Sequence, residues 1–171
     1  MSVQEHRQEA PSVVKCLVVT VSDTRTEETD KSGQLISRLL VEKGYIVTDY
    51  QIVKDEYSEV QRWIINGSER SDVDAVLING GTGIALRDTT HEAVKDSLDK
   101  EIPGFGELFR YLSYVEDIGT ASILSRAIAG VRGSTAVFSM PGSSGAVSLA
   151  MNRIILPELA HVIREIRKDR K

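Results

Sequence analysis

Short apolar runs alternate with longer amphipathic stretches along most of this chain, and this alternation restricts its fold more than any other feature of the sequence. The runs typical of strands are Lys15–Val21, Tyr45–Val53, Val73–Ile78 and Ser134–Met140. Strands that alternate with helices pair in parallel, because each right-handed crossover returns the chain to the same edge of the sheet. The first run is apolar almost throughout, which is typical of a strand buried on both faces. The pattern therefore predicts an α/β fold with a mostly parallel sheet and helices on both faces.

Helices are predicted where apolar residues recur every three or four positions. The first helical stretch, 32–43, carries Leu35, Ile36, Leu39 and Leu40 on one face. The expected caps and stops are Asp30 and Gly44 for this helix, Ser58 and Asn66-Gly67 for the second, and Thr89 or Thr90 for the start of the third.

The rhythm of strand and helix breaks between residues 103 and 130, where no clear strand is visible. Two helices are expected there, over Phe105–Val115 and Ala121–Ala129. This insertion either covers an edge of the sheet or forms a contact between subunits, and the sequence leaves both open. Gly142 then opens a last long helical stretch, which Pro157 should kink or restart.

Composition limits the class of protein. A chain of 171 residues suits one domain, and we expect residues 14–171 to form it after a flexible polar arm over residues 1–13. Lys and Arg number 21 and Asp and Glu number 25, so the net charge is −4. This charge argues against a nucleic-acid-binding protein, whose surface is normally basic. An anionic ligand must then be held by local donors, chiefly backbone N–H groups.

The single cysteine, Cys16, excludes an internal disulfide and lies in an apolar run, so we interpret it as a buried core thiol. By inspection, no apolar stretch is long enough to span a membrane, and the polar residues 1–11 do not resemble a signal peptide. The sequence therefore predicts a cytoplasmic protein with no membrane partner.

Polar and glycine-rich residues follow the predicted strands directly. The four turns are Ser22-Asp23-Thr24-Arg25, Lys54-Asp55-Glu56, Asn79-Gly80-Gly81-Thr82-Gly83 with Arg87-Asp88, and Pro141-Gly142-Ser143-Ser144-Gly145. In a parallel sheet all four lie at one edge, and ligands of open sheets bind outside the carboxyl ends of the strands. The turns therefore predict one site for a small anionic ligand.

Two of these turns have the chemistry of anion sites. The Gly80–Gly83 loop can point successive N–H groups inward as an anion nest, although a tight turn that simply needs glycine explains it equally well. The turn from Pro141 leads into a helix N-terminus, which favours anions. Taken singly, that turn is explained more simply by ordinary capping through Ser143 or Ser144.

Asp55 and Asp88 are the carboxylates that we assign to this site. Acidic groups beside a phosphate repel it unless a cation lies between them, and Mg²⁺ binds through a few carboxylates together with phosphate oxygens. Each aspartate taken singly is more often a cap or turn residue. Arg25, Arg87 and Arg126 have the shape to bind phosphate oxygens, but a surface ion pair is the better interpretation of any one of them.

Several familiar motifs are missing. No G-x-G-x-x-G follows the first strand, which weakens a dinucleotide-binding fold, and no G-x-x-x-x-G-K-[ST] occurs, which excludes a P-loop protein. The three histidines, His6, His91 and His161, are not expected to form a ligand set. His91-Glu92 also lacks the second histidine of a zinc-protease helix.

Five segments carry a family resemblance, in order along the chain. They are Val21-Ser22-Asp23-Thr24-Arg25 with Asp30-Lys31-Ser32-Gly33, Asn79-Gly80-Gly81-Thr82-Gly83 with Arg87-Asp88-Thr89-Thr90, Ile102-Pro103-Gly104-Phe105-Gly106-Glu107, Leu124-Ser125-Arg126-Ala127, and Met140-Pro141-Gly142-Ser143. From about residue 14 to residue 165 the sequence resembles the MoaB/MogA family of molybdenum cofactor biosynthesis proteins, and most of all its MoaB branch.

The resemblance implies a three-layer α/β/α fold that binds molybdopterin, a pterin dithiolene bearing a phosphate, and a homotrimer or homohexamer. It also implies adenylylation of molybdopterin with Mg-ATP, which releases pyrophosphate. On this resemblance Asp55 and Asp88 are catalytic and hold Mg²⁺, Gly80, Gly81, Thr82 and Gly83 cradle phosphate, and Ser22, Asp23, Ser125, Pro141, Gly142 and Ser143 line the pterin pocket. After Pro141-Gly142 relatives often carry Asn-Pro or Ser-Pro, where this chain has Ser143-Ser144.

Three functions follow from these observations. The first is an adenylyltransferase acting on molybdopterin, the second a non-catalytic molybdopterin-binding carrier, and the third a different phosphate-ligand protein, such as a nucleotide or sugar-phosphate binder. The ordered set of segments disfavours the third, and the paired aspartates favour the first over the second.

Overall fold

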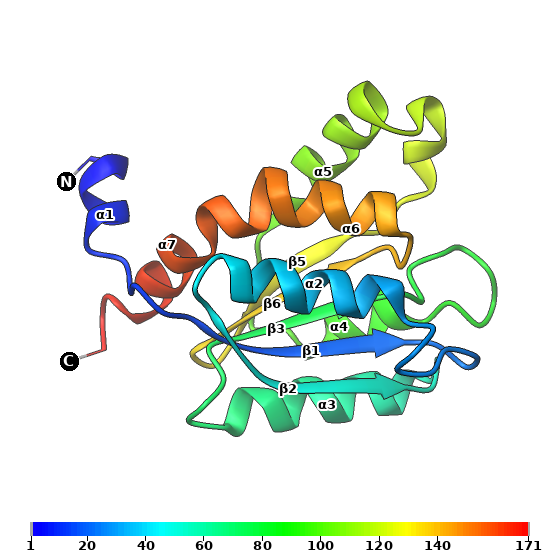
Figure 1. Ribbon diagram of the computed structural model, residues 1–171, viewed down its shortest axis with the longest axis horizontal. Coiled ribbons are helices and arrows are strands. Elements are labelled where there is room, and N and C mark those ends of the chain that lie inside the picture. Colours follow the sequence, from blue (N-terminus) through cyan, green and yellow to red (C-terminus); the bar gives the residue numbers. More distant parts are fainter. Residues whose placement is uncertain (1, 171) are drawn as a thin grey trace.

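A six-stranded, mostly parallel sheet forms the centre of the molecule (Figure 1). The computed structural model describes residues 2–170, so Met1 of the predicted arm and Lys171 of the predicted domain lie outside the described residues. The strands are β1 Lys15–Val21, β2 Ile46–Val53, β3 Ala75–Asn79, β4 Lys100–Glu101, β5 Ile128–Arg132 and β6 Thr135–Met140. Their order is β2-β1-β3-β6-β5-β4. The first four strands of this order are parallel to one another, whereas β5 is antiparallel to β6 and β4 is antiparallel to β5.

Helices cover both faces of the sheet. They are α1 Val3–Gln8, α2 Lys31–Glu42, α3 Tyr57–Glu69, α4 Thr90–Ser97, α5 Pro103–Glu116, the 3₁₀ helix η1 Gly119–Leu124, α6 Ser144–Ala150, the π-helical turn η2 Met151–Ile155 and α7 Leu156–Arg167. The helices α2, α5, α6 and α7 pack on one face, and α3 and α4 pack on the other (Figure 1). The predicted three-layer α/β/α fold is therefore confirmed.

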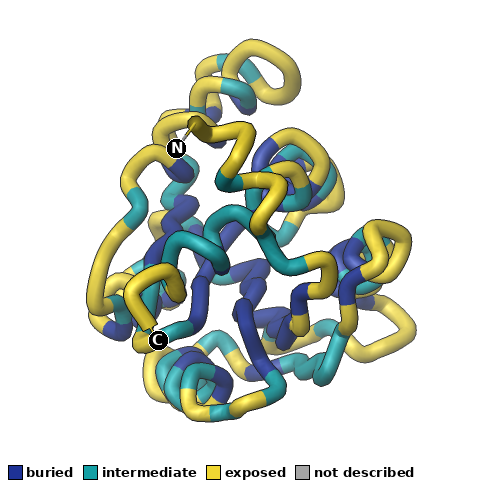
Figure 2. Tube along the Cα trace, turned by 90° about the vertical axis from the view of Figure 1, so that its left-hand side faces the viewer, coloured by how far each residue is buried: buried dark blue, intermediate teal, exposed yellow. Residues whose placement is uncertain are grey.

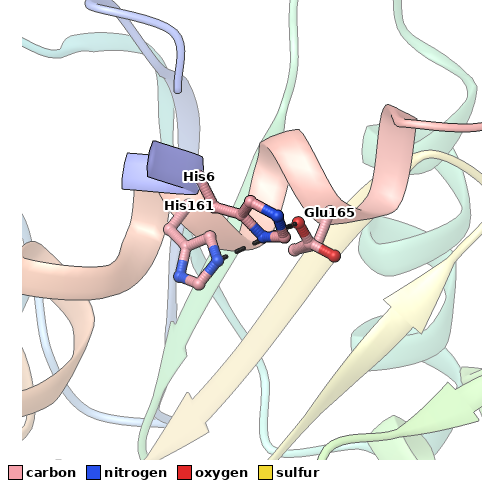
Figure 3. A group of neighbouring side chains, drawn as sticks. All are labelled: His6, His161 and Glu165. Carbon is pink, nitrogen blue, oxygen red and sulfur yellow. Dashed lines mark ion pairs between the residues drawn. The ribbon is translucent and has the colours of Figure 1, made fainter. Parts of the chain in front are cut away.

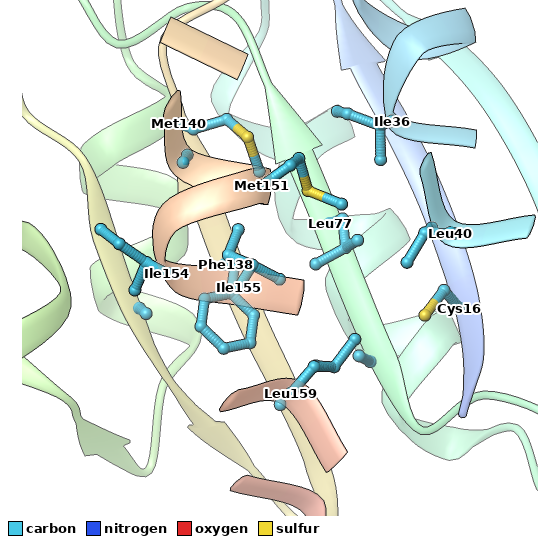
Figure 4. Close-up of a cluster of buried hydrophobic side chains, with 14 of the residues drawn as sticks. Cys16, Ile36, Leu40, Leu77, Phe138, Met140, Met151, Ile154, Ile155 and Leu159 are labelled. Carbon is cyan, nitrogen blue, oxygen red and sulfur yellow. The ribbon is translucent and has the colours of Figure 1, made fainter. Parts of the chain in front are cut away.

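The sheet separates two hydrophobic clusters, and the strands supply both by alternation. In β1, Cys16 and Val18 belong to the cluster beneath α2, α6 and α7, and Leu17 and Val19 belong to the cluster beneath α3 and α4. Figure 4 shows the first cluster, where the side chains of the central strands meet those of α2 and the last helix. Buried backbone accordingly runs through the middle of the molecule, with exposed segments outside it (Figure 2). The interpretation of Cys16 as a buried core thiol is confirmed.

The predicted helix ends are confirmed for some helices and wrong for others. Asp30 caps α2 by accepting a hydrogen bond from the Gly33 N–H at 3.0 Å. Ser58 does not cap α3, because it lies inside the first turn and the cap position belongs to Glu56. The helix α3 also continues through Asn66-Gly67. A Cβ on Gly67 would lie 2.8 Å from Val76, so this glycine permits close packing of α3 on the sheet instead of ending the helix.

The helix expected over Ala121–Ala129 is wrong. The short helix η1 ends at Leu124, and Ile128 begins β5, which pairs with β6 as a hairpin. Two residues, Gly133 and Ser134, join these strands, and Gly133 has a φ of +59°, a conformation that tight hairpin turns need. The periodicity of a short apolar run does not distinguish a strand from a helix. The tight turn after residues 128–132 pairs them with β6, and they therefore form a strand. The insertion thus extends the sheet at the β6 edge.

The last three helical elements form one continuous stretch of 24 residues, Ser144–Arg167, that is long and apolar enough to cross a membrane by length and composition. The expectation that no such stretch exists is therefore wrong. Met151, Leu159 and Ile163 of this stretch are nevertheless fully buried against the sheet, so we interpret it as a core helix. Pro157 was predicted to kink or restart this helix, and it lies in the first turn of α7, directly after the π-helical turn η2.

The helix α1 lies within the segment predicted to be a flexible arm. It packs beside α7, where His6 Nδ1 lies 3.0 Å from Glu165 Oε1 and Arg7 forms an ion pair with Glu158. Figure 1 shows α1 next to the C-terminal end of α7, away from the arrowheads of β1 and β2. Flexibility of residues 1–13 stays a prediction.

Candidate functional site

The four turns predicted to meet do lie together at the carboxyl ends of β1, β2, β3 and β6. The N–H of Gly80 donates to the Met140 carbonyl at 3.1 Å, which joins the third turn to the fourth. Nη2 of Arg25 donates to the Gly142 carbonyl at 3.0 Å, and the N–H of Asp55 donates to Asp23 Oδ1 at 3.1 Å. Each turn is thus hydrogen-bonded to another, and the prediction that they share one edge is confirmed.

Glycine is required in the loop after β3. Gly80 and Gly81 have φ values of +97° and +66°, in the left-handed region that other residues rarely adopt. A Cβ on Gly80 would lie 2.3 Å from the Val21 carbonyl oxygen, and one on Gly142 would lie 3.1 Å from Gly80 Cα. The turns after β1, β3 and β6 therefore pack backbone against backbone, which leaves main-chain groups at the surface of the site.

The rest of this loop is folded by Asp88. Its Oδ2 accepts a hydrogen bond from the Ala85 N–H at 2.9 Å and lies 2.4 Å from where a Cβ on Gly83 would be. Thr82, between the glycines, is buried. Asp88 thus faces the glycine loop, as a site residue requires, and also shapes the loop, as a turn residue would.

Arg126 holds this loop from outside. Its Nε and Nη2 donate to the Gly83 carbonyl at 2.9 and 2.6 Å, and Nη2 also donates to the Asp88 carbonyl at 2.9 Å. Nη1 pairs with Glu92. Because these donors are used by the protein itself, Arg126 acts as a positioning residue of the loop and not as the phosphate ligand that its shape allowed.

The first turn is built by Ser22 and linked to the others by Asp23. The Ser22 hydroxyl accepts hydrogen bonds from the N–H groups of Thr24 and Arg25, at 3.2 and 3.1 Å. Asp23 Oδ2 accepts from Arg87 Nη2 at 2.8 Å. The pKa of Asp23 is lowered, chiefly because its carboxylate accepts the backbone hydrogen bond from Asp55, so this group is ionised at the site.

Asp55 lies where both burial and neighbouring charges disfavour its ionised form. Its Oδ1 is buried and has no hydrogen-bond partner among residues 2–170. Burial raises the pKa of Asp55, and the nearby charges of Asp88 and Asp23 raise it further. Three carboxylates thus lie close enough to repel one another, which costs free energy unless a cation or a proton is present.

Two threonines carry further unpartnered oxygens, and that of Thr90 lies beside the glycine loop. Thr89 Oγ1 and Thr90 Oγ1 are buried without a hydrogen-bond partner in the described chain. A Cβ on Gly81 would lie 2.1 Å from Thr90 Oγ1 and 3.0 Å from Asp55 Oδ1, so both oxygens are close to this glycine. Thr89 or Thr90 was predicted to cap α4, and Thr89 does occupy the cap position, although without a side-chain hydrogen bond. The place of the Thr90 hydroxyl beside Asp55 was not predicted, because nothing in the local sequence indicates it.

Asp30, a buried aspartate, fixes the backbone next to the site through hydrogen bonds. Asp30 is fully buried and accepts hydrogen bonds from the Gly33 N–H, the Tyr50 hydroxyl and, at 3.4 Å, Arg25 Nη1. Ser32 Oγ donates to the Gly142 carbonyl at 2.7 Å. The start of α2 therefore anchors both the first turn and the last. Only the Asp30-Lys31-Ser32-Gly33 segment pointed to this support, and nothing in the sequence indicated Tyr50.

Comparison with known proteins identifies the family. A family model described as a probable molybdopterin binding domain matches residues 17–161. The chain is 69% identical over 170 residues to molybdenum cofactor biosynthesis protein B of Halalkalibacterium halodurans, covering 99% of this chain and 100% of that protein. The chain belongs to the MoaB/MogA family of molybdenum cofactor biosynthesis proteins.

Solved structures agree with this assignment. A crystal structure of molybdenum cofactor biosynthesis protein B has 61% identity and a TM-score of 0.91, covering 94% of this chain and 99% of that one. The tungsten cofactor synthesizing protein MoaB of Pyrococcus furiosus has 42% identity and a TM-score of 0.81, covering 92% and 99%. A MogA structure has 30% identity and a TM-score of 0.80, covering 89% and 99%. The resemblance stated from the sequence segments is confirmed.

The remaining residues predicted for the MoaB/MogA pterin pocket are spread along the same edge. Ser143 caps α6 by accepting a hydrogen bond from the Ala146 N–H at 3.2 Å, so the capping interpretation of this turn is confirmed. Pro141 is partly exposed between Met140 and Gly142. Ser125 follows η1 and is joined to the glycine loop through its neighbour Arg126. The roles of these residues toward a pterin stay predictions.

Replacing Asp55 with asparagine should stabilise the protein at neutral pH. A carboxyl whose pKa is raised by folding lowers the free energy of unfolding as pH rises from its ordinary pKa to the raised one, and the loss is complete above the raised value; the asparagine removes this charge. Solvent screening keeps the gain to about 1 kcal/mol or less, equivalent to a rise in Tm of roughly 2–4 °C. Thermal unfolding at pH 7 measures it, and the gain should shrink as the pH falls below the ordinary carboxyl range. Glu69→Gln, at an exposed position of α3, is the control and should not change the Tm. An unchanged or lower Tm of Asp55→Asn would contradict the repulsion.

Gly81→Ala should destabilise the protein and damage the site. The new Cβ would meet Thr90 Oγ1 at 2.1 Å with φ at +66°, which predicts a cost of about 1–3 kcal/mol. Gly104→Ala is the matched control, because a Cβ there meets nothing within 4 Å and the residue lies in α5. Urea denaturation of both variants tests the requirement, which fails if the two unfold at the same midpoint.

Proposed function

We propose that this protein binds molybdopterin and adenylylates it with Mg-ATP, giving adenylyl-molybdopterin and pyrophosphate. Its place in the MoaB family and in molybdenum cofactor biosynthesis rests on the comparisons above. The observation that carries the proposed chemistry is the unpartnered, buried Oδ1 of Asp55 beside the glycine loop. A buried carboxylate oxygen without a donor is the natural counterpart of a cation brought in with a nucleotide.

The residues present fit a magnesium ion. Asp55 and Asp88 would hold it, because Mg²⁺ prefers carboxylate oxygens and would relieve the repulsion that raises the Asp55 pKa. When bound, the ion would neutralise and orient the phosphates of ATP. Asp23 stays engaged with Arg87 and the Asp55 N–H, so it orients Asp55.

The proposed reaction is a transfer between phosphates. An anionic oxygen of the pterin phosphate attacks the α-phosphorus of ATP, a new P–O bond forms, and the bond from the α-phosphorus to the bridging oxygen breaks as pyrophosphate leaves. The attacking oxygen is largely deprotonated at neutral pH, so the protein need not supply a general base. The protein's part is to position the two phosphates in line, through the N–H groups of Gly81–Gly83, while Ser22, Asp23, Ser125, Pro141, Gly142 and Ser143 line the pterin pocket. The N–H of Gly80 was predicted to join them, but it already donates to the Met140 carbonyl, so Gly80 shapes the turn instead.

One observation favours the alternative function, a non-catalytic molybdopterin carrier. Asp88 Oδ2 already accepts a hydrogen bond from Ala85, so the carboxylate serves the fold of the loop whether or not an ion binds. A carrier needs the loop and the pocket but not turnover.

Pyrophosphate release from ATP in the presence of Mg²⁺ and molybdopterin tests the proposal. The wild type should turn over, and Asp55→Asn and Asp88→Asn should each lose activity by about 100-fold or more, since removing one group that stabilises developing phosphate charge costs this much. Glu69→Gln, at an exposed position of α3, should retain full activity. Absence of turnover in a wild type that molybdopterin stabilises against heat would contradict the enzyme and support the carrier.

We propose further that the protein works as a homo-oligomer, either a trimer or a hexamer, in the cytoplasm. The helices α5 and η1 stand out from the body of the molecule (Figure 1). Their exposed large apolar side chains are Leu108, Tyr111, Tyr114, Val115, Ile118, Ile123 and Leu124. Such a gathering on one projection is typical of a surface that another protein covers. It also favours the subunit contact that the sequence analysis left open for this insertion.

The double variant Tyr111→Glu, Ile123→Glu tests the oligomer. These side chains are 63% and 81% exposed in the single chain, so charges there should not disturb its fold but should dissociate the assembly. Light scattering of the eluting protein should report a monomer. Val41→Glu, at an exposed position of α2, should leave the assembly intact. A monomeric wild type, or an unaffected double variant, would contradict this surface as the contact.

A further inference from the structure

Two of the three histidines meet, although the sequence gave no reason to expect it. His6 on α1 and His161 on α7 lie next to each other beside Glu165, and Figure 3 marks an ion pair from each histidine to Glu165. His6 Nδ1 is 3.0 Å from Glu165 Oε1, and His161 Nε2 is 3.9 Å from the same oxygen. The two histidines meet because folding docks α1 onto the last helix, whereas His91 lies apart on α4.

The three side chains have the geometry of an almost formed metal site. One donor atom from each lies within 4.8 Å of the other two. A zinc ion with ligands at about 2.0–2.2 Å needs donors roughly 3–3.5 Å apart, so small rotamer changes would close the set. Two histidines and one carboxylate are a ligand combination that Zn²⁺ uses when a fourth position stays open to water.

A second carboxylate already orients one of these histidines. His161 Nδ1 lies 2.9 Å from Glu158 Oε2, and an Nδ1–H that donates to this carboxylate leaves the lone pair on Nε2, the atom that faces Glu165. Histidine ligands of metal ions almost always have such a partner, which fixes the tautomer and the ring orientation. This hydrogen bond points to a ligand role independently of the clustering.

Two basic side chains lie beside Glu165 and offset its charge. Lys168 Nζ lies 2.9 Å from Glu165 Oε2 and Arg164 Nη1 lies 2.6 Å from Oε1. Both carboxylate oxygens of Glu165 therefore already face cationic groups, as oxygens that bind a metal ion would. Arg164 also forms an ion pair with Glu9, so its guanidinium keeps a carboxylate partner when a metal ion binds Oε1 of Glu165.

We propose that His6, His161 and Glu165 bind one Zn²⁺ ion, with Glu158 as the positioning residue of His161. The side chains of the three ligands are 25%, 18% and 31% exposed, so the ion can enter from solvent and keep water on its open side. Bound there, it fastens α1 to α7.

This zinc site is separate from the candidate functional site. It lies toward the end of α7 that Arg167 ties to Asp74, at 2.6 Å, and Asp74 Oδ2 accepts from the N–H of Lys15 at the start of β1. The zinc site is therefore near the amino ends of the strands, whereas Asp55 and Asp88 are at the carboxyl ends. The inference does not depend on the proposed adenylylation.

Calorimetric titration of the untagged, full-length protein with ZnCl₂ tests the proposal. One ion per chain should bind, and His6→Ala and His161→Asn should each weaken binding by at least tenfold. Glu158→Gln should weaken it by about 10–100-fold, as loss of such a partner does at other metal sites. His91→Ala is the matched control, because it removes the third histidine and should leave the affinity unchanged.

Two further measurements fix the place of the ion. Co²⁺ in place of Zn²⁺ should give a visible absorption spectrum that His161→Asn abolishes, and Zn²⁺ should slow proteolysis of residues 2–13 in the wild type but not in His6→Ala. Zinc affinity should be retained in Asp55→Asn. A wild type that does not bind zinc, equal losses in His91→Ala and His161→Asn, or loss in Asp55→Asn alone would overturn the assignment.

Discussion

The close approach of the β3 and β6 turns is the constraint on which the rest of the site depends. Parallel pairing places Thr20 opposite Asn79 and Asn79 opposite Met140, so β1, β3 and β6 end at the same level. Gly80 and Gly142 can then touch, because neither carries a side chain where the backbones meet. A register shift of one residue in either pair would separate these turns, and the carboxylates from β2 and from the long loop after β3 would lose their common neighbour.

Repulsion among the carboxylates at this edge of the sheet lowers the stability of the fold. Asp55 is part-buried near two other carboxylates, and its pKa is raised as a result, while neutral residues of similar size would be more stable there. Arg126, Ser32 and Arg25 hold the surrounding backbone carbonyls so that the loop cannot relax away from this repulsion. An arrangement held against its own electrostatics is typical of a binding or catalytic site. The proposed zinc site near the amino ends of the strands differs, because basic side chains lie beside its carboxylate.

Much of this site could be predicted from the sequence, since it depends on local patterns. The strand ends, the glycine loop, the cap at Asp30 and the edge shared by Asp55 and Asp88 follow from periodicity and from the parallel sheet. Tertiary contacts decided the rest. The hairpin at Gly133 made a strand of residues 128–132, Arg126 was recruited by the carbonyls of a loop distant in sequence, and His6 met His161 only because α1 docks on α7. Contacts between residues so distant in sequence cannot be predicted from the spacing of residues along the chain.

The most direct test of the account is the position of a bound cation. We expect crystals grown with Mn²⁺ and a non-hydrolysable ATP analogue to show an anomalous scattering peak coordinated by Asp55 and Asp88. The phosphates of the analogue should lie against the N–H groups of Gly81–Gly83. A peak bound by other residues, with both carboxylates free of metal and the phosphates away from the glycine loop, would contradict the claim that these turns build a single phosphate site.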